Sequence, residues 1–192
     1  VPGHAPQDVT VVFVRHGQAL TEDHTPLGPP LSALGRRQAR HLAQRLKHQS
    51  FTRIVASDLT RAAQTAALLR PHHLRTPFVH DPRVREVQMH HHGTDPIPRN
   101  AAYRATLRAE RRRVASFCRA LAREAKAGDR ILIVAHGNLI RLATALLCGV
   151  DPRRSFFFRT YNTSVTVLTF HAGGRTGHKL ILADCIRHLP PA

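Results

Sequence analysis

The stretch Val9-Thr-Val-Val-Phe-Val14, followed by Arg15-His16-Gly17, decides the fold of this chain. The first six residues are apolar or β-branched, which is typical of a strand buried on both faces of a sheet. Such a strand delivers the polar residues that follow it to the carboxyl-terminal edge, where α/β sheets place their sites. Ile131-Leu-Ile-Val-Ala135 repeats the pattern and ends in His136-Gly137. The sequence therefore predicts two strands that each bring a histidine to this edge.

Helical patterns alternate with the strands along the chain. Apolar residues recur at helical spacing in four segments, and Ser32 and Asp58 stand where they can cap the first two. The alternation predicts an α/β fold with a mainly parallel sheet covered on both faces. Because no repeat, low-complexity tract or linker interrupts it, we expect one domain over residues 1–192. The predicted helices span 32–48, 58–69, 100–127 and 138–148, and the further strands lie at 53–57, around Val84, at 163–170 and at 179–183.

The composition narrows the classes of function. Lys and Arg number 29 against 12 Asp and Glu, which gives a net charge of +17 before any of the 15 His is counted. An acidic or phosphorylated partner fits this balance. Aromatic residues make up only 5% and Trp is absent, which argues against a surface that stacks single-stranded nucleic acid. The three cysteines form no Cys-x-x-Cys pair, so neither a disulfide framework nor a zinc knuckle is predicted and a reducing compartment is favoured.

The sequence predicts no membrane span. The apolar runs Val11–Val14 and Ile131–Ala135 are far shorter than the roughly 20 residues that a membrane-spanning helix needs. The first residues, Val1-Pro2-Gly3-His4, lack the charged region and the long apolar stretch of a secretory signal. We therefore expect a cytoplasmic protein.

Arg15-His16-Gly17 combines residue types that suit phosphate chemistry. A histidine held at the end of a strand can act as an exposed nucleophile, and Gly17 lets backbone or substrate approach closely. The planar guanidinium of Arg15 matches the oxygens of a phosphate group. Taken alone, three residues are also compatible with a structural histidine at the end of a strand.

Four separated motifs together resemble the histidine phosphatase superfamily, which includes the cofactor-dependent phosphoglycerate mutases. The resemblance covers the chain from about Val11 to Phe170, in order, spacing and flanking strands. It implies a three-layer α/β/α sandwich. The motifs are Arg15-His16-Gly17, Pro30-Leu31-Ser32-x-x-Gly35-x-x-Gln38-Ala39, Ser57-Asp58-Leu59-Thr60-Arg61-Ala62-x-Gln64-Thr65 and Ala135-His136-Gly137-Asn138.

The resemblance implies a role for each residue of the phosphate pocket. His16 would take the phosphoryl group as a phosphohistidine that water then hydrolyses, and Arg15, Arg61 and His136 would surround the phosphate. Phosphoryl transfer spreads charge over the equatorial oxygens, so fixed cations stabilise its transition state. These groups replace a divalent ion, and we therefore expect neither a metal nor a cofactor.

The resemblance also implies a proton donor for the leaving alkoxide. The superfamily carries a glutamate after the Arg61 helix and before a glycine-containing loop, and Arg85-Glu86 ahead of Gly93 fits this pattern. Glu86 is therefore the predicted acid and base. Asp81 and Asp95 lie in the same segment and are the competing candidates.

Three further residues are predicted to contact the substrate. Asn138 opens a helix, and its backbone N–H is placed to bind phosphate. Gln18 directly follows the Arg15-His16-Gly17 motif, and we expect it to contact the substrate. Thr163 lies in an element that resembles one near the pocket of the superfamily, and it is predicted at the pocket rim.

Two departures from the mutases favour hydrolysis. Glu22 stands where the mutase motif carries an asparagine, which places an anion at an expected anion site. Only 50 positions separate Glu86 from His136, which leaves no room for the long insertion that covers a mutase substrate. A mutase must exclude water from its phosphohistidine, whereas a hydrolase must admit it. The sequence therefore predicts a metal-independent phosphomonoesterase, with phosphoglycerate mutase and a phosphohistidine or phosphoserine protein phosphatase as alternatives.

The remaining basic residues leave a non-enzymatic alternative open. His90-His91-His92 fits a solvated or substrate-rim loop better than a metal site, because consecutive residues do not easily face one ion. A solvated helix face is the simpler interpretation of a row of arginines, and docking of an anionic partner is the other. The alternative is a catalytically silent basic module, for instance one that binds nucleic acid. The row of arginines, on the predicted helix 100–127, consists of Arg104, Arg108, Arg111, Arg112 and Arg119.

Overall fold

A computed structural model describes residues 8–21, 26–88, 100–151, 159–173 and 178–190. Six strands form one sheet in the order β3-β2-β4-β1-β5-β6, with parallel pairing from β3 to β1 and antiparallel pairing at β5 and β6. The strands are β1 (Asp8–Arg15), β2 (Arg53–Ala56), β3 (Phe78–His80), β4 (Arg130–Ala135), β5 (Val165–His171) and β6 (Lys179–Cys185), and the helices are α1 (Ala33–Leu46), α2 (Thr60–Leu69), α3 (Ala101–Glu124) and α4 (Gly137–Leu147).

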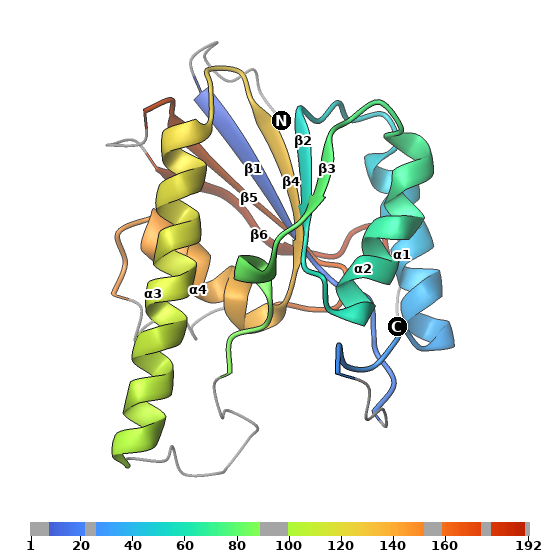
Figure 1. Ribbon diagram of the computed structural model, residues 1–192. Coiled ribbons are helices and arrows are strands. Elements are labelled where there is room, and N and C mark those ends of the chain that lie inside the picture. The colour runs from blue at the N-terminus through green and yellow to red at the C-terminus, as the bar shows by residue number, and fades with distance from the viewer. Residues whose placement is uncertain (1–7, 22–25, 89–99, 152–158, 174–177, 191–192) are drawn as a thin grey trace.

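Helices cover both faces of the sheet (Figure 1). The alternating side chains of β1 show why, since both sets are apolar: Val11 and Phe13 pack in the core under α3 and α4. Val12 and Val14 pack in the core under α1 and α2. A strand that is buried on both faces must be apolar throughout, and this confirms the predicted three-layer α/β/α sandwich with a mainly parallel sheet.

Strands β1 and β4 are direct neighbours, which sets the geometry of the site. They pair in parallel with Arg15 opposite Ala135, and the backbone N–H of His16 donates to the carbonyl of Ala135 at 2.9 Å. Parallel pairing in this register places His16 and His136 side by side, although 120 positions separate them in the sequence.

Two local predictions were wrong. The strand expected around Val84 lies earlier, as the short, mostly exposed β3, and Pro82–Val84 form a 3-10 turn, η2. Asp58 does not cap α2, because Leu59 occupies the N-cap position without a side-chain hydrogen bond. The Asp58 carboxylate instead pairs with the Arg85 guanidinium, at 2.7 and 2.5 Å.

Within the described segments, none of the helices has the length and apolar character that crossing a membrane requires.

Candidate active site

His16 presents one ring nitrogen to the site and uses the other to fix its orientation. Its Nδ1 lies 2.6 Å from the Gly17 carbonyl oxygen, which can only accept a hydrogen bond, so Nδ1 carries the ring proton. Its Nε2 accepts a hydrogen bond from Nε of Arg61 at 3.0 Å. The lone pair of Nε2 therefore faces the Arg61 guanidinium and becomes available to attack phosphorus when that N–H turns to another acceptor.

The surroundings of His16 keep its imidazole neutral. Burial lowers the pKa of His16 to about 3, and the positive charges of Arg61 and Arg15 act in the same direction. Burial likewise lowers the pKa of His136 well below its usual range, followed by the effect of His16 and the nearby arginines. A neutral imidazole retains its lone pair at neutral pH, so His16 needs no separate base to activate it.

His136 packs against His16, behind the residues that line the site. The two ring centroids are 5.0 Å apart, and Nε2 of His136 lies 2.9 Å from the Ser57 hydroxyl. Its Nδ1 is buried and has no hydrogen-bond partner in the described part of the chain. The side chain is fully buried and does not line the pocket of His16, so the predicted direct contact of His136 with the phosphate is not formed in this structure.

Two arginines give the pocket its positive charge. Arg15 donates from Nη1 to the Thr160 carbonyl, while its Nε is buried without a partner among the described residues. Neither Arg15 nor Arg61 forms an ion pair with an acidic side chain in the segments that the structure describes. Partly buried guanidiniums that lack a carboxylate partner suit an anionic ligand.

Glu86 is the carboxylate of this site. Its Oε1 accepts backbone N–H groups from Asn138 and Leu139, at 3.1 and 3.2 Å, at the first turn of α4. It also accepts the N–H of Val87 at 3.0 Å. Burial raises the pKa of Glu86 despite these hydrogen bonds and the nearby arginines. Burial thus favours the protonated form that a general acid needs.

Arg15, His16, Arg61 and Glu86 line one pocket of about 540 Å³. The sequence profile of the histidine phosphatase superfamily (branch 1) matches residues 11–93 and 88–181. The chain belongs to the histidine phosphatase superfamily.

Relatives from several organisms agree with this membership. A probable phosphoglycerate mutase GpmB from Yersinia enterocolitica is 31% identical over 180 residues, covering 81% of this chain and 82% of the relative. A putative alpha-ribazole-5'-P phosphatase from Escherichia coli superposes with a TM-score of 0.73 at 23% identity, over 93% of this chain and 98% of that one. A phosphoserine phosphatase from Entamoeba histolytica gives 0.72 at 20% identity, over 95% and 100%. At these identities the two structures show a shared fold.

The three further predicted contacts of this superfamily member have different outcomes. Gln18 and Asn138 line the pocket, but the backbone N–H of Asn138, predicted to bind phosphate, already donates to Glu86. Thr163 is fully buried and its hydroxyl donates to the Asn162 carbonyl at 2.7 Å. Asn162 takes the rim position instead and donates from Nδ2 to the His16 carbonyl at 3.1 Å. The predicted position of Thr163 at the pocket rim is therefore wrong, and the pocket is lined by its neighbour Asn162.

Asp81 is the remaining predicted candidate within the described residues, and it does not line the pocket. Asp81 pairs with Arg83 at 2.7 Å and accepts the N–H of Arg83 at the start of η2, so it does not compete with Glu86. Glu22, Asp95 and the run His90-His91-His92 lie outside the described residues.

Two glycines allow the His16 loop to lie directly against the start of α1. A Cβ on Gly35 would come 1.9 Å from the Gln18 carbonyl oxygen, and one on Gly17 would come 2.4 Å from the Gly35 carbonyl oxygen. The N–H of Gly17 donates to the Thr65 hydroxyl at 3.1 Å. The loop that follows His16 is therefore fixed from both α1 and α2.

Gly35→Ala is expected to displace this loop. The added methyl group overlaps backbone rather than a flexible side chain, so the free energy of unfolding should fall by about 1–3 kcal/mol and turnover should fall with it. Urea denaturation and phosphate release measure the two effects. Arg37→Ala, on the exposed side of the same helix, is the control. Wild-type stability and activity in Gly35→Ala would contradict the described packing.

His16 is also expected to limit stability in acid. Its native pKa is about 3 against the ordinary 6.5, so the unfolded chain binds this proton first. The His16 contribution is therefore complete above about pH 6.5 and declines by about 1.4 kcal/mol per unit as the pH falls toward 3. We predict that His16→Ala loses stability less steeply than the wild type between about pH 6 and pH 4. His41→Ala, at an exposed histidine, should keep the wild-type slope, and equal slopes in all three proteins would refute the buried neutral imidazole.

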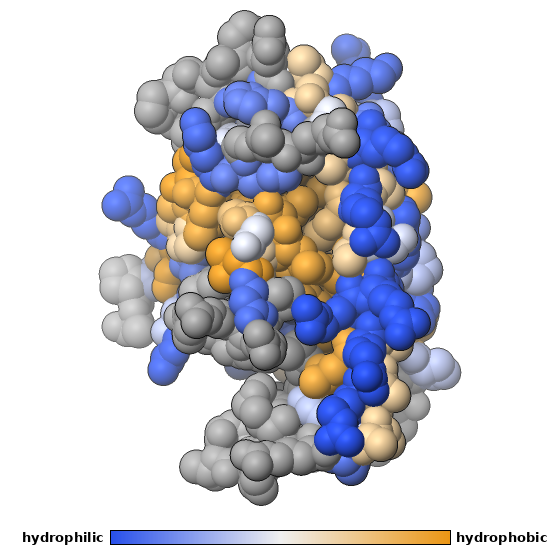
Figure 2. All heavy atoms as spheres, turned by 90° about the vertical axis from the view of Figure 1, so that its left-hand side faces the viewer, coloured by the Kyte–Doolittle hydropathy of each residue, from blue (hydrophilic) through white to orange (hydrophobic). Residues whose placement is uncertain are grey.

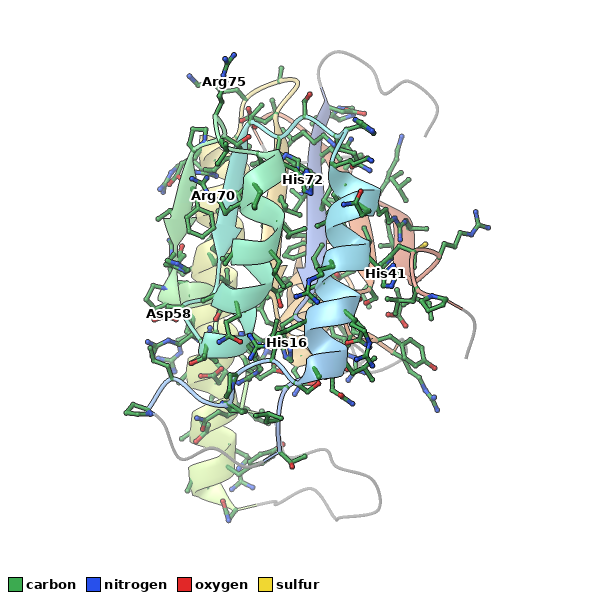
Figure 3. The ribbon with its side chains drawn as sticks, turned by 90° about the vertical axis from the view of Figure 1, so that its right-hand side faces the viewer. His16, His41, Asp58, Arg70, His72 and Arg75 are labelled. Atoms are coloured by element: carbon green, nitrogen blue, oxygen red, sulfur yellow. The ribbon has the colours of Figure 1, made fainter. Side chains whose placement is uncertain are left out.

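A second pocket, of about 580 Å³, lies at the other end of the sheet. It is lined by residues 47–51 and 71–77, and none of the predicted site residues is among them. Figure 3 shows His72 and Arg75 at the end of the molecule opposite to His16. The candidate site is therefore the pocket that contains His16.

Proposed function

We propose that this protein is a metal-independent phosphomonoesterase that hydrolyses a phosphate ester through a phosphohistidine on His16. The observation that carries the proposal is the neutral imidazole of His16, whose Nε2 keeps its lone pair. It shares a pocket with Arg15, Arg61 and the buried carboxyl of Glu86. Nucleophile, cations and proton donor are the three parts that this reaction needs.

The first step transfers the phosphoryl group to His16. Nε2 attacks phosphorus, the ester P–O bond breaks, and the leaving alkoxide takes the proton of Glu86. The Arg61 N–H that faces Nε2 in the free protein turns to a phosphoryl oxygen, and Arg15 binds a second one. The Nδ1–H bond to Gly17 stabilises the positive charge that develops on the ring.

The second step returns the enzyme to its starting state. The Glu86 carboxylate takes a proton from water as the water oxygen attacks phosphorus, and the P–N bond breaks. Inorganic phosphate leaves, Nε2 regains its lone pair, and Glu86 is again protonated. The same carboxyl therefore serves as acid and then as base.

Chelator resistance tests the metal-independent part of the proposal. In this mechanism Arg15 and Arg61 supply the positive charge that a divalent ion supplies elsewhere. Turnover of an aryl phosphate is expected to stay within experimental error after dialysis against EDTA. A loss that added Mg²⁺, Mn²⁺ or Zn²⁺ restores would overturn this part.

Phosphoglycerate mutase activity is the second candidate, because the relative from Yersinia enterocolitica carries that name. The 50 positions between Glu86 and His136 favour an open pocket and hydrolysis. The assay follows free phosphate from 3-phosphoglycerate with and without 2,3-bisphosphoglycerate. Net phosphate release without the bisphosphate is expected, and phosphate exchange without net release would identify a mutase.

The substrate class is proposed to be a small phosphorylated molecule, as the names of a ribazole phosphate phosphatase and a phosphoserine phosphatase suggest. A phosphoprotein is the alternative. A phosphate-release screen over sugar phosphates, nucleotides, phospho-acids and phosphopeptides separates small molecules from phosphoproteins as substrates. The compounds with the highest kcat/KM identify the substrate class.

The alternative function, a basic binding module, is supported less well by the surface of the protein than an enzyme is supported by the pocket. The arginines of α3 that were predicted on one face are exposed, and hydrophilic residues run along this helix in Figure 2. Arg15 and Arg61, in contrast, converge on His16. Nucleic acid binding that survives His16→Ala, in a protein without phosphatase activity, would favour the module.

A further inference from the structure

Glu86 sits on a segment without regular secondary structure, and one arginine from α3 binds the backbone of that segment. Arg113 donates from Nη1 to the carbonyl oxygens of Arg83 and Arg85, at 2.6 and 3.0 Å. From Nη2 it donates to the carbonyl oxygen of Glu86 at 3.2 Å. A single guanidinium thus binds three carbonyls within four consecutive residues.

We propose that Arg113 is a positioning residue that holds the Glu86 backbone so that its carboxyl reaches the site, an inference that rests on the acid role given to Glu86 under the proposed function. Arg113 is not among the residues that line the pocket, so it acts through Glu86. Glu110, one turn earlier on α3, forms an ion pair with Arg113. This pair fixes the guanidinium from its own helix.

The geometry explains why an arginine is needed here. The five N–H donors of a guanidinium lie in one plane and diverge, so they can reach carbonyls that point from different residues. A lysine ammonium carries its donors on one atom and cannot span the same positions. Further anchors of the segment are the buried side chains of Val84 and Val87, the Asn138 side chain, which donates to the Val87 carbonyl at 3.3 Å, and the Arg85–Asp58 pair at its exposed side.

A displaced acid has a specific kinetic signature. Aryl phosphates with electron-poor rings release a stable phenolate and depend little on proton donation, whereas alkyl phosphates release a strongly basic alkoxide. A shift of about 1 Å in a catalytic group can lower the rate about 100-fold. Loss of Arg113 should therefore affect alkyl esters much more than nitrophenyl phosphate.

The experiment compares kcat/KM across a series of aryl and alkyl phosphates for Arg113→Lys, Arg113→Ala, Glu86→Gln and the control Arg112→Ala. Arg112 is the neighbouring exposed arginine on α3, so its removal takes away the same charge from the same helix. Circular dichroism and thermal unfolding establish that each variant is folded, and Arg113→Lys retains charge and chain length if the alanine variant does not fold.

We expect both folded Arg113 variants to lose about 10–100-fold on alkyl esters and only a few-fold on nitrophenyl phosphate, while Arg112→Ala follows the wild type. An equal loss on every ester, or none, would overturn the positioning role. If Glu86→Gln shows no dependence on the leaving group, the acid assignment itself fails. If Glu86→Gln shows it and the Arg113 variants do not, only the inference on Arg113 fails.

Discussion

Replacement of His16 by alanine is expected to abolish phosphate release from aryl and alkyl esters alike, by about 10⁴-fold or more. The variant lacks the atom that forms the bond to phosphorus, and His136, the neighbouring imidazole, is not placed to replace it: its Nε2 lies against the Ser57 hydroxyl and its ring is fully buried. Unlike loss of a proton donor, this loss should not depend on the leaving group. Colorimetric phosphate release under saturating substrate measures it.

The control for this variant is His41→Ala. His41 lies on α1, exposed and apart from His16 in Figure 3, and its removal should leave turnover within a few-fold of the wild type. Binding of inorganic phosphate by His16→Ala shows that Arg15 and Arg61 still form the pocket. Near wild-type hydrolysis in His16→Ala would contradict the proposed nucleophile.

The second large effect is expected from Glu86→Gln, which should lower kcat/KM for alkyl phosphates by about 10²–10⁴-fold. Glutamine keeps the shape of the side chain but cannot supply a proton. Burial raises the pKa of Glu86, so the active protonated form is lost as the pH rises through that pKa. His16 must be neutral to act as a nucleophile, so activity is also expected to fall in acid as His16 becomes protonated near pH 3.

The pH profile identifies the group that titrates. In the wild type we expect kcat/KM to fall on the alkaline side as Glu86 ionises, and this limb should be absent in Glu86→Gln. Asp81→Asn is the matched control, because Asp81 is bound to Arg83 outside the pocket. An alkaline limb that persists in Glu86→Gln and disappears in Asp81→Asn would assign the acid to Asp81.

The parts of the site that follow strands could be predicted from the sequence. The β-branched runs before His16 and His136 are apolar because both faces of β1 and β4 are buried. Parallel pairing then brings the ends of both strands together, whatever their separation in the chain. The residue pattern was therefore enough to predict that the two histidines lie close together at one edge of the sheet.

The parts that depend on long-range hydrogen bonds could not be predicted in detail. Asn138 lies in the first turn of α4, which begins one residue earlier than predicted, at Gly137. Which acceptor its N–H meets depends on where Glu86 lies, 52 positions earlier. Thr163 and Asn162 are adjacent, and no sequence pattern shows that Thr163 has a left-handed backbone, with φ of 59°, or that Asn162 lines the pocket. The strand β3 has a single neighbour and is mostly exposed, so it carries little hydrophobic pattern.

The net charge of +17 is only partly accounted for by the site. Arg15 and Arg61 converge on the proposed phosphate position, and Arg113 holds the segment that carries the acid. Nine further arginines in the described part of the chain are exposed on α1 and α3, outside the pocket of His16.

Trapping of the phosphorylated enzyme tests the central claim most directly. An aryl phosphate with an isotopically labelled phosphoryl group is mixed with the enzyme, and the reaction is quenched in alkali during the first turnover, where phosphohistidine is stable. The proposed mechanism predicts one labelled phosphoryl group per chain, located on His16 by peptide mapping and absent from His16→Ala. Label on a different residue, or turnover of the wild type without any labelled enzyme, would contradict it.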